Sequence, residues 1–180
     1  MEIIGWLFLA LFVVAAVSIV GPGIVGAPWL PTPVNELAAV LKEAGLKPGE
    51  VFIDLGCGDG RVLIAAAGIF GAQCIGVEID PLKIPLARWR VKRAGLSEKV
   101  KIIRASAMDT PLAEADVVFL YLSHQLIDRL KPKFARELKP GARIVSFGFM
   151  VSGFPLVKTD AGKKWFVYKM ALGRNINRYS

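Results

Sequence analysis

The feature that most constrains this chain is a short apolar run that ends in an acidic residue and three alternate glycines. Residues 51–55 are apolar except for Asp54, so they predict a buried strand with a carboxylate near its end. Glycines at this spacing permit a tight turn and let a ligand approach the backbone. In an open parallel sheet, ligands bind at the carboxyl ends of the strands. These glycines are Gly56, Gly58 and Gly60.

Apolar runs and helical patterns alternate along the rest of the chain. Strands are expected at 51–55, 74–77, 100–105, 116–122, 142–147 and 164–172. Helices are expected at 34–44, 61–70, 81–94 and 123–137, and Pro132 lies inside the last of them. Strands that alternate with helices form a parallel sheet covered on both faces. We therefore expect an α/β fold, with a Rossmann-like, doubly wound and mostly parallel sheet.

The glycine turn has an obvious rival interpretation as a dinucleotide-binding fingerprint. That fingerprint has the spacing G-x-G-x-x-G and places a pyrophosphate at the start of the helix. Here the spacing is G-x-G-x-G, position 61 is Arg61, and the acids Asp54 and Asp59 flank the glycines. Carboxylates beside a pyrophosphate repel it, whereas they suit a positively charged sulfonium ligand that also carries an amino group. The pattern therefore favours a sulfonium nucleoside over a nicotinamide cofactor.

A second acidic position follows the next expected strand. Glu78 comes directly after Gly76 and Val77, where a carboxylate can accept hydrogen bonds from both hydroxyls of a ribose. The alternative is a surface acid that caps the following helix, a role that Asp80, before Pro81, fills well. The two roles are compatible, so we expect Glu78 at a ribose and Asp80 at the helix start.

The first part of the chain is strongly apolar. No charged residue or histidine occurs from residue 3 to residue 35, and residues 3–20 are almost purely aliphatic and aromatic, apart from Ser18. As a helix this segment would be roughly 27 Å long, close to the ~30 Å hydrocarbon core of a bilayer. A cleaved signal peptide would need a basic start, but Glu2 is the only charge there. A single transmembrane helix is therefore expected.

Charge and cysteine content exclude little on their own. The net charge is +8, which suits anionic lipid head groups, nucleic acid or acidic protein partners. The basic cluster at 88–93 is most simply a solvated helix face. Cys57 and Cys74 are not spaced as C-x-x-C, and His124 is the only histidine, so no metal site is expected.

Several motifs together resemble those of a known family. Residues 54–61 followed by 78–81 look like motif I and the following acidic motif of class I S-adenosylmethionine-dependent methyltransferases. Segments 115–122, 130–133, 137–141 and 143–146, together with Pro31-Thr32-Pro33, are similar to a small group of protein-lysine methyltransferases, archaeal and membrane-anchored mitochondrial. The resemblance covers residues 28–155 and implies methyl transfer from S-adenosyl-L-methionine to a protein lysine.

The resemblance also implies which residues contact the methyl donor. They are Thr32, Asp54, Gly56, Cys57, Gly58, Glu78, Ile79, Ser106 and Ala107. Two departures from the family pattern stand out. The family commonly has an acid after strand three, where this chain has Ser106, with Asp109 three residues later. It also tends to have a tryptophan-proline element after strand five, where this chain has Gly153-Phe154-Pro155.

Methyl transfer from a sulfonium mainly requires that the nucleophile be positioned and water be excluded. A lysine must first lose its proton, which a desolvated pocket favours. Tyr121, at the end of strand four, can line that pocket and orient the amine as a catalytic residue, or can simply pack at the sheet edge. His124 falls in the first turn of a helix capped by Ser123, where a solvated histidine is the simpler interpretation.

These inferences give a domain plan. Residues 1–26 are expected to be a membrane anchor, residues 27–35 a stiff proline-rich connector, and residues 36–180 the methyltransferase domain. An enzyme that uses this donor belongs where the donor is, so the domain is expected on the cytoplasmic side of the membrane. A protein substrate is the expected partner.

Three other functions remain open. A lipid or quinone methyltransferase would use the anchor to reach a membrane-dissolved substrate. A DNA or RNA methyltransferase would suit the positive charge, but residues 120–123 lack the Asn/Asp-Pro-Pro-aromatic element that usually holds a flipped base. A non-enzymatic membrane adaptor would not bind the methyl donor at all.

Overall fold

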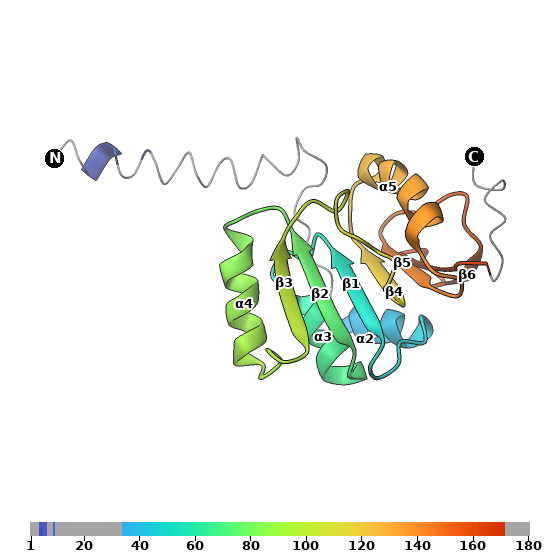
Figure 1. Cartoon of the computed structure of the whole chain (residues 1–180), viewed down its shortest axis with the longest axis horizontal. Coiled ribbons are helices and arrows are strands. Elements are labelled where there is room, and N and C mark those ends of the chain that lie inside the picture. Colours follow the sequence, from blue (N-terminus) through green and yellow to red (C-terminus); the bar gives the residue numbers. More distant parts are fainter. Residues whose placement is uncertain (1–3, 7–8, 10–33, 172–180) are drawn as a thin grey trace.

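The computed structural model describes residues 4–6, 9 and 34–171. A seven-stranded sheet forms its centre (Figure 1). The strand order is β3-β2-β1-β4-β5-β7-β6. The strands are β1 Val51–Leu55, β2 Gln73–Glu78, β3 Val100–Arg104, β4 Val117–Leu120, β5 Arg143–Phe147, β6 Leu156–Thr159 and β7 Trp165–Lys169. Strands β1 to β5 run parallel to one another, and β7 runs antiparallel to both β5 and β6. The expected Rossmann-like, mostly parallel sheet is confirmed.

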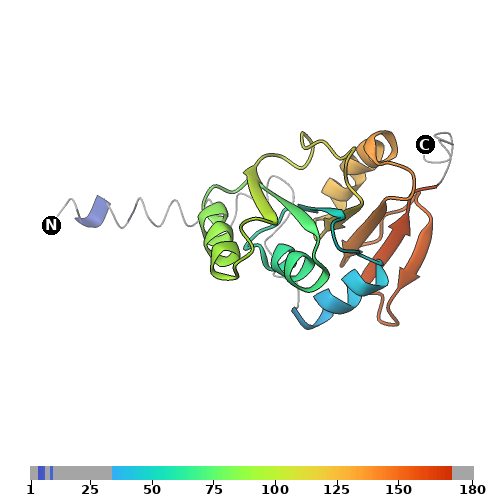
Figure 2. The ribbon, with the colours of Figure 1, turned by 60° about the horizontal axis from the view of Figure 1, so that its bottom comes forward.

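Helices cover both faces of this sheet (Figure 2). They are α2 Val34–Glu43, α3 Arg61–Phe70, α4 Lys83–Arg93 and α5 His124–Glu137. Side chains alternate across each strand, so Phe52 of β1 packs in the cluster that α2, α3 and α4 cover. Its neighbour Ile53 packs in the other cluster, with α5. The sheet is therefore buried on both faces, which explains why its strands are apolar runs rather than alternating ones.

Some element boundaries differ from the sequence expectation. Strand four is shorter than expected, because β4 ends at Leu120 and Tyr121 lies beyond it. Pro132 does not interrupt α5, and Ser123 caps that helix by accepting a hydrogen bond from the Leu126 amide at 3.4 Å. Strand β6 was not expected, because all four of its residues are exposed and it has no buried apolar pattern.

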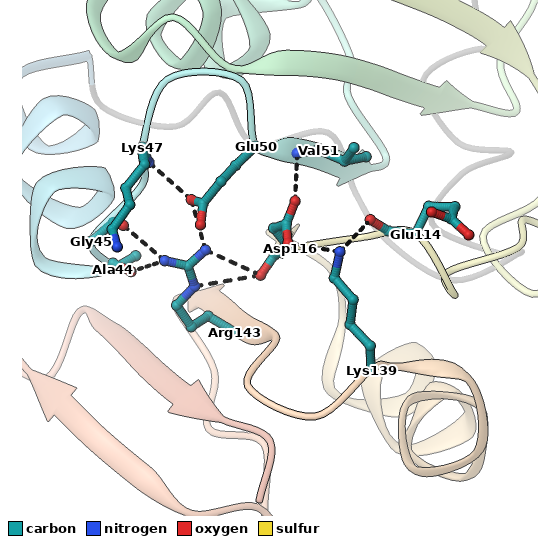
Figure 3. Close-up of polar contacts among 9 residues, drawn as sticks. All are labelled: Ala44, Gly45, Lys47, Glu50, Val51, Glu114, Asp116, Lys139 and Arg143. Atoms are coloured by element: carbon teal, nitrogen blue, oxygen red, sulfur yellow. Dashed lines mark hydrogen bonds and ion pairs between the residues drawn. The ribbon is translucent and has the colours of Figure 1, made fainter. Parts of the chain in front are cut away.

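The amino ends of the central strands are joined by an ionic network (Figure 3). Arg143, at the start of β5, pairs with Glu50 at 2.7 Å and donates to the carbonyls of Ala44 and Gly45 at 3.2 and 2.8 Å. These two carbonyls follow the end of α2, where a cation is favourable. Arg143 therefore ties the end of α2 to the amino ends of β1 and β5.

Asp116 extends this network to β4. Its carboxylate accepts a hydrogen bond from the Val51 amide at 2.8 Å and pairs with Lys139 at 2.7 Å (Figure 3). Lys139 also donates to the Glu114 carbonyl at 3.0 Å. These contacts lie at the edge of the sheet opposite the glycine turn, so they fix the strands without occupying the ligand-binding edge.

Within the described residues, no helix is long and apolar enough to cross a bilayer. The expected anchor at 1–26 and connector at 27–35 fall almost entirely outside those residues, and so does Thr32.

Candidate active site

The glycine turn follows β1 at the carboxyl edge of the sheet. Gly56, Gly58 and Gly60 have φ angles of 84°, 53° and 79°, which side chains of L-residues rarely tolerate. The amides of Gly56 and Cys57 both donate to the Val77 carbonyl, at 2.8 and 2.9 Å. The turn is therefore fixed against the end of β2, which places it between the two strands that carry the expected site acids.

Close packing around the turn leaves no room for side chains at two glycines. A Cβ at Gly56 would lie 2.9 Å from Cδ2 of Leu122. A Cβ at Gly76 would lie 2.4 Å from Cδ1 of Leu63 and 2.9 Å from Sγ of Cys57. Burial, together with the nearby acids, raises the pKa of the Cys57 thiol, so that side chain is a neutral core residue. Only the backbone of Cys57 is suited to meet a ligand.

Glu78 links the end of β2 to the glycine turn. Its Oε2 accepts a hydrogen bond from the Gly58 amide at 2.9 Å, and its Oε1 accepts from the Ile79 and Asp80 amides, both at 2.9 Å. The side chain is buried. Carboxylate oxygens have about four acceptor positions in all, so these three hydrogen bonds fix the carboxylate and leave one position for a ligand.

The expectation that Asp80 is the N-cap of the following helix is wrong, because the N-cap of α4 is Leu82, whose side chain makes no capping hydrogen bond. Asp80 Oδ1 accepts a hydrogen bond from the Leu82 amide at 2.9 Å, and Oδ2 lies 3.4 Å from Nζ of Lys83. The regular helix α4 begins at Lys83, two residues later than expected, because residues 81 and 82 form a turn. Asp80 therefore supports the start of α4 and leaves Glu78 at the strand end.

Asp54 carries the one buried side-chain oxygen that lacks a hydrogen-bond partner in the described part of the chain, its Oδ2. Burial raises the pKa of this carboxyl well above its ordinary value, and the negative charges of Glu78 and Asp59 add to the effect. A buried carboxylate without a partner is costly, so such a group is a candidate for contact with a ligand. Positive charge at this point would relieve that cost.

Asp59 does not share this role, contrary to the expectation that both acids of the turn face a cation. It is buried and pairs with Arg61 at 2.6 Å and with Arg90 of α4. Burial alone would raise the pKa of Asp59, but the hydrogen bonds from Arg61 and the charges of both arginines lower it overall. The expectation that the basic cluster on α4 is merely a solvated face is therefore wrong for Arg90.

Two residues expected to contact the methyl donor, Ser106 and Ala107, lie after β3. Ser106 begins a turn in which its hydroxyl accepts from the Met108 amide at 3.1 Å and its carbonyl from the Asp109 amide at 3.1 Å. Ala107 packs partly against the core on the α5 side. The Ala105 amide donates to the Glu78 carbonyl at 3.1 Å, which brings this turn beside the end of β2. Asp109 is exposed.

Tyr121 lies just beyond β4. Its ring contacts Phe147 at the end of β5 and lies close to Gly148, the next residue along the chain. The ring centroids of Tyr121 and Phe147 are 5.2 Å apart in an edge-to-face arrangement. A Cβ at Gly148 would lie 3.0 Å from Cε2 of Tyr121. The Tyr121 hydroxyl has no hydrogen-bond partner among the described residues. His124 is exposed, and its Nδ1 lies 3.0 Å from Asp128 on the same helix, which fits a solvated position.

The Gly153-Phe154-Pro155 segment is part of the core. Phe154 is buried and packs edge-to-face against Phe134 of α5, with ring centroids 6.3 Å apart. The loop before it is held by the Tyr168 hydroxyl, which accepts from the Val151 amide at 2.9 Å. This segment therefore anchors the loop after β5 onto the α5 side of the sheet.

The site fits the donor expected from the sequence in both charge and room. The unpartnered oxygen of Asp54 offers a buried hydrogen-bond acceptor to an ammonium group, and a sulfonium or ammonium nearby would favour the ionised form of this carboxyl. Glu78 is fixed at the adjacent strand end, where a ribose would lie. Gly56 and Gly58 have no side chains to block the approach to the turn.

Comparison with known proteins agrees with this geometry. The family model described as ANTKMT methyltransferase domain matches residues 54–158, more than half of the chain. A protein-lysine N-methyltransferase of Saccharolobus islandicus is 33% identical over 82% of this chain and 95% of its own length. The adenine nucleotide translocase lysine N-methyltransferase of Mus musculus is 32% identical over 68% of this chain, but this chain covers only 53% of it.

A solved structure supports the same assignment. An RNA methyltransferase from Salinibacter ruber, in complex with S-adenosyl-L-homocysteine, is 33% identical with a TM-score of 0.74, and the match covers 79% of this chain and 94% of that one. This chain belongs to the ANTKMT methyltransferase domain family and is a class I methyltransferase that uses S-adenosyl-L-methionine.

Proposed function

We propose that this protein transfers a methyl group from S-adenosyl-L-methionine to the side-chain amine of a lysine in a protein. The single observation that carries the donor site is the buried, unpartnered carboxylate oxygen of Asp54 beside Glu78 at the glycine turn. The acceptor is inferred from the relatives in Saccharolobus islandicus and Mus musculus, both named as lysine N-methyltransferases.

In this proposal the ends of β1, β2 and β3 hold the donor. Glu78 accepts a hydrogen bond from a ribose hydroxyl at its one remaining acceptor position, in addition to the three that it accepts from backbone amides. Asp54 supplies negative charge toward the cationic methionine part. Ile79 is 50% exposed directly after Glu78, so it offers an apolar surface to the adenine ring. Ser106 and Ala107 flank the same place from the end of β3.

The acceptor amine would enter beside Tyr121. When bound, the donor supplies a methyl group on a sulfonium, an excellent leaving group, so the protein has mainly to position a neutral amine. The aromatic rings of Tyr121, Phe147 and Phe149 lie near the ends of β4 and β5, and such apolar surroundings disfavour the charged ammonium. The free hydroxyl of Tyr121 can accept a hydrogen bond from the amine and orient its lone pair.

We also infer that residues 3–20 anchor the protein in a membrane, with the methyltransferase domain on the cytoplasmic side. The support is the uncharged, apolar sequence of that segment and its length, which matches a bilayer. Residues 27–35 would then connect the anchor to the domain that starts at residue 36.

RNA is the second candidate acceptor. It is favoured by the likeness to the Salinibacter ruber RNA methyltransferase and by the positive charge of this chain. Against it stands the sequence at 120–123, Leu-Tyr-Leu-Ser, which has no proline-rich element to hold an extruded base.

One experiment separates these acceptors. The purified full chain is incubated with methyl-labelled donor and, in parallel, with its native membranes and with total RNA from the same cells. Acid hydrolysis and amino-acid analysis are expected to recover the label as methyl-lysine from the membrane sample. Label in nucleosides or in extracted lipid alone would overturn the lysine assignment. A Glu78→Ala chain, expected to be inactive, controls for contaminating enzymes.

A further inference from the structure

Helix α4 presents an unpartnered apolar stripe to the outside of the protein. It lies at the β3 margin of the molecule (Figure 1). Leu82, Leu86 and Trp89 are 50%, 47% and 55% exposed, and their i, i+4, i+7 spacing places them on one side of the helix. The opposite side is buried through Ile84 and Val91. Three large apolar side chains in one exposed row are unusual for a surface without a partner.

Basic residues surround this stripe. The segment 83–104 contains eight lysines and arginines and one acid, Glu98, so it carries +7 of the chain's net charge of +8. Helix α4 itself has no acidic residue. The positive charge of the protein is therefore concentrated on one helix, the loop that follows it and the edge strand β3.

Only part of this charge is used inside the fold. Arg90 pairs with Asp59, and Arg88 donates to the Ile102 carbonyl at 3.0 Å. Lys92, Lys99 and Arg104 are exposed and form no ion pair within the described residues. Arg93 lies over the Trp89 ring, with its guanidinium carbon 5.4 Å from the ring centroid. The charges that flank the apolar stripe are thus available to an external anionic partner.

We propose that this face of α4, the residues Leu82, Leu86, Trp89, Lys92 and Arg93, binds the surface of an anionic lipid bilayer. The leucines and the tryptophan would lie at the level of the head groups, where an aromatic ring with an apolar body and a polar tip is favourable. Lys92 and Arg93 would reach the lipid phosphates with their heads while their stems cover apolar surface. The residues involved lie outside the proposed donor and acceptor contacts.

A bilayer fits this face better than a nucleic acid does. RNA would neutralise the lysines and arginines, but it would leave Leu82 and Leu86 exposed to water. A helix that lies in a membrane interface combines an apolar row with basic flanks, and its binding depends on both. The apolar run at residues 3–20 is consistent with a location near a membrane, although the α4 proposal does not depend on it.

The test uses an environment-sensitive fluorophore on the full chain. Leu86→Cys is labelled with a nitrobenzoxadiazole dye, which reacts selectively because Cys57 and Cys74 are buried. Ile69→Cys is the matched control, since Ile69 is 64% exposed but belongs to α3 and not to the proposed α4 surface. Both proteins are mixed with vesicles of phosphatidylcholine alone and of phosphatidylcholine with phosphatidylserine. Flotation reports separately whether the whole chain associates with each kind of vesicle. A failure of the N-terminal anchor can therefore be told apart from a failure of α4 to contact the lipid.

A blue shift and enhanced emission are expected at position 86 only with the anionic vesicles, and high salt should reverse them. Adding Lys92→Gln and Arg93→Gln should reduce the bound fraction at position 86 roughly tenfold or more. Quenching of Trp89 by brominated lipid, measured as the difference from Trp89→Phe, gives a second readout without a label. Equal responses at positions 86 and 69, or a response at 86 to RNA instead of vesicles, would overturn the proposal.

Discussion

Glu78 accepts a hydrogen bond from the amide of Gly58 at 2.9 Å, which joins the end of β2 to the glycine turn after β1. The same carboxylate holds the two amides that follow it in the chain. The residue proposed to bind the ribose is therefore also the residue that fixes the turn beneath the donor. Removal of the Glu78 side chain therefore affects both the ribose contact and the conformation of the turn. Different substitutions at this position separate these two effects.

Substitution of Glu78 is expected to weaken donor binding in two steps. Glu78→Ala removes all acceptors and should raise the dissociation constant for S-adenosyl-L-methionine roughly a hundredfold, as expected for loss of one charged hydrogen bond together with the contacts that fix the turn. Glu78→Gln keeps one acceptor oxygen and should cost about tenfold. Isothermal titration of the full chain measures both. Glu98→Gln, an exposed acid after α4, is the control, and unchanged affinity in Glu78→Ala would remove Glu78 from the site.

Asp54→Asn is expected to stabilise the free protein at neutral pH. Folding raises the pKa of the Asp54 carboxyl. Below the ordinary pKa of an aspartate the group is protonated in both the folded and the unfolded state, so its burial does not lower the free energy of unfolding there. The destabilisation then grows as the pH rises from about 4 toward the raised value. The asparagine carries no charge, so its unfolding midpoint should exceed that of the unmodified protein at pH 7, and the difference should shrink at pH 4. A lower midpoint at pH 7 would contradict this account.

The same substitution is expected to weaken donor binding. The ionised form of Asp54 attracts the cationic donor, so affinity for S-adenosyl-L-methionine should rise with pH through the raised pKa of this carboxyl. In Asp54→Asn that pH dependence should disappear and affinity should fall. Titrations across the pH range measure both. An unchanged pH dependence would assign it to another group.

Asp59→Asn is expected to have the opposite effect on stability. The arginines lower the pKa of Asp59 below its ordinary value of about 4. The stabilisation that this carboxylate gives the folded state is therefore fully present above about pH 4, and it is lost as the pH falls through the lowered pKa. Loss of its partly buried ion pairs with Arg61 and Arg90 should cost about 1–3 kcal/mol in the free energy of unfolding at pH 7. Asp128→Asn, which breaks exposed pairs on α5, should change the denaturant midpoint little. Equal effects of the two substitutions would refute this.

Gly56→Ala is expected to destabilise more than Gly95→Ala. Both glycines have positive φ, so each alanine is strained by about 1–2 kcal/mol. Only at Gly56 does the new Cβ also meet another side chain, Leu122 Cδ2 at 2.9 Å, whereas nothing lies within 4 Å at Gly95. Leu122→Ala removes a buried side chain and destabilises by itself, but it should cost less in Gly56→Ala, where it also relieves the contact, than in Gly95→Ala. Chemical denaturation of the four proteins decides the matter.

Tyr121→Phe is expected to lower the turnover number several-fold without loss of stability or donor affinity. The hydroxyl has no partner within the described residues, so its removal breaks no hydrogen bond, and the ring contact with Phe147 remains. Steady-state kinetics with a lysine substrate, together with thermal unfolding, test this. Tyr168→Phe is the contrasting control, because its hydroxyl accepts from the Val151 amide and its loss should destabilise the protein. Unchanged turnover in Tyr121→Phe would leave that residue a packing role.

The sheet and the glycine turn could be predicted because local sequence determines them. Apolar strands, the glycine spacing and Ser123 at the start of α5 each follow from a few adjacent residues. Strand β6 could not, since Leu156–Thr159 is exposed and becomes a strand only through pairing with β7. Its hydrogen bonds come from a partner that no local pattern identifies.

The ion pairs around the site also could not be predicted from short stretches of sequence. Asp59 and Arg90 are far apart in the sequence, and their pairing depends on how α4 packs beside α3. The acid at position 59 therefore looked available to a ligand, when the fold neutralises it. Likewise nothing adjacent to Arg143 indicates that it holds the end of α2. In both cases the tertiary arrangement decides which charges remain free.

The placement of β7 between β5 and β6 has a consequence for how the protein is made. β5 has no neighbour on that side until Trp165–Lys169 has left the ribosome, and β6 pairs with no other described strand. The preceding strands can assemble during synthesis, but their sheet keeps an open, aggregation-prone margin until the hairpin of β6 and β7 docks. A chain that terminates before residue 165 should thus be an aggregation-prone fragment, not a folded enzyme with reduced activity.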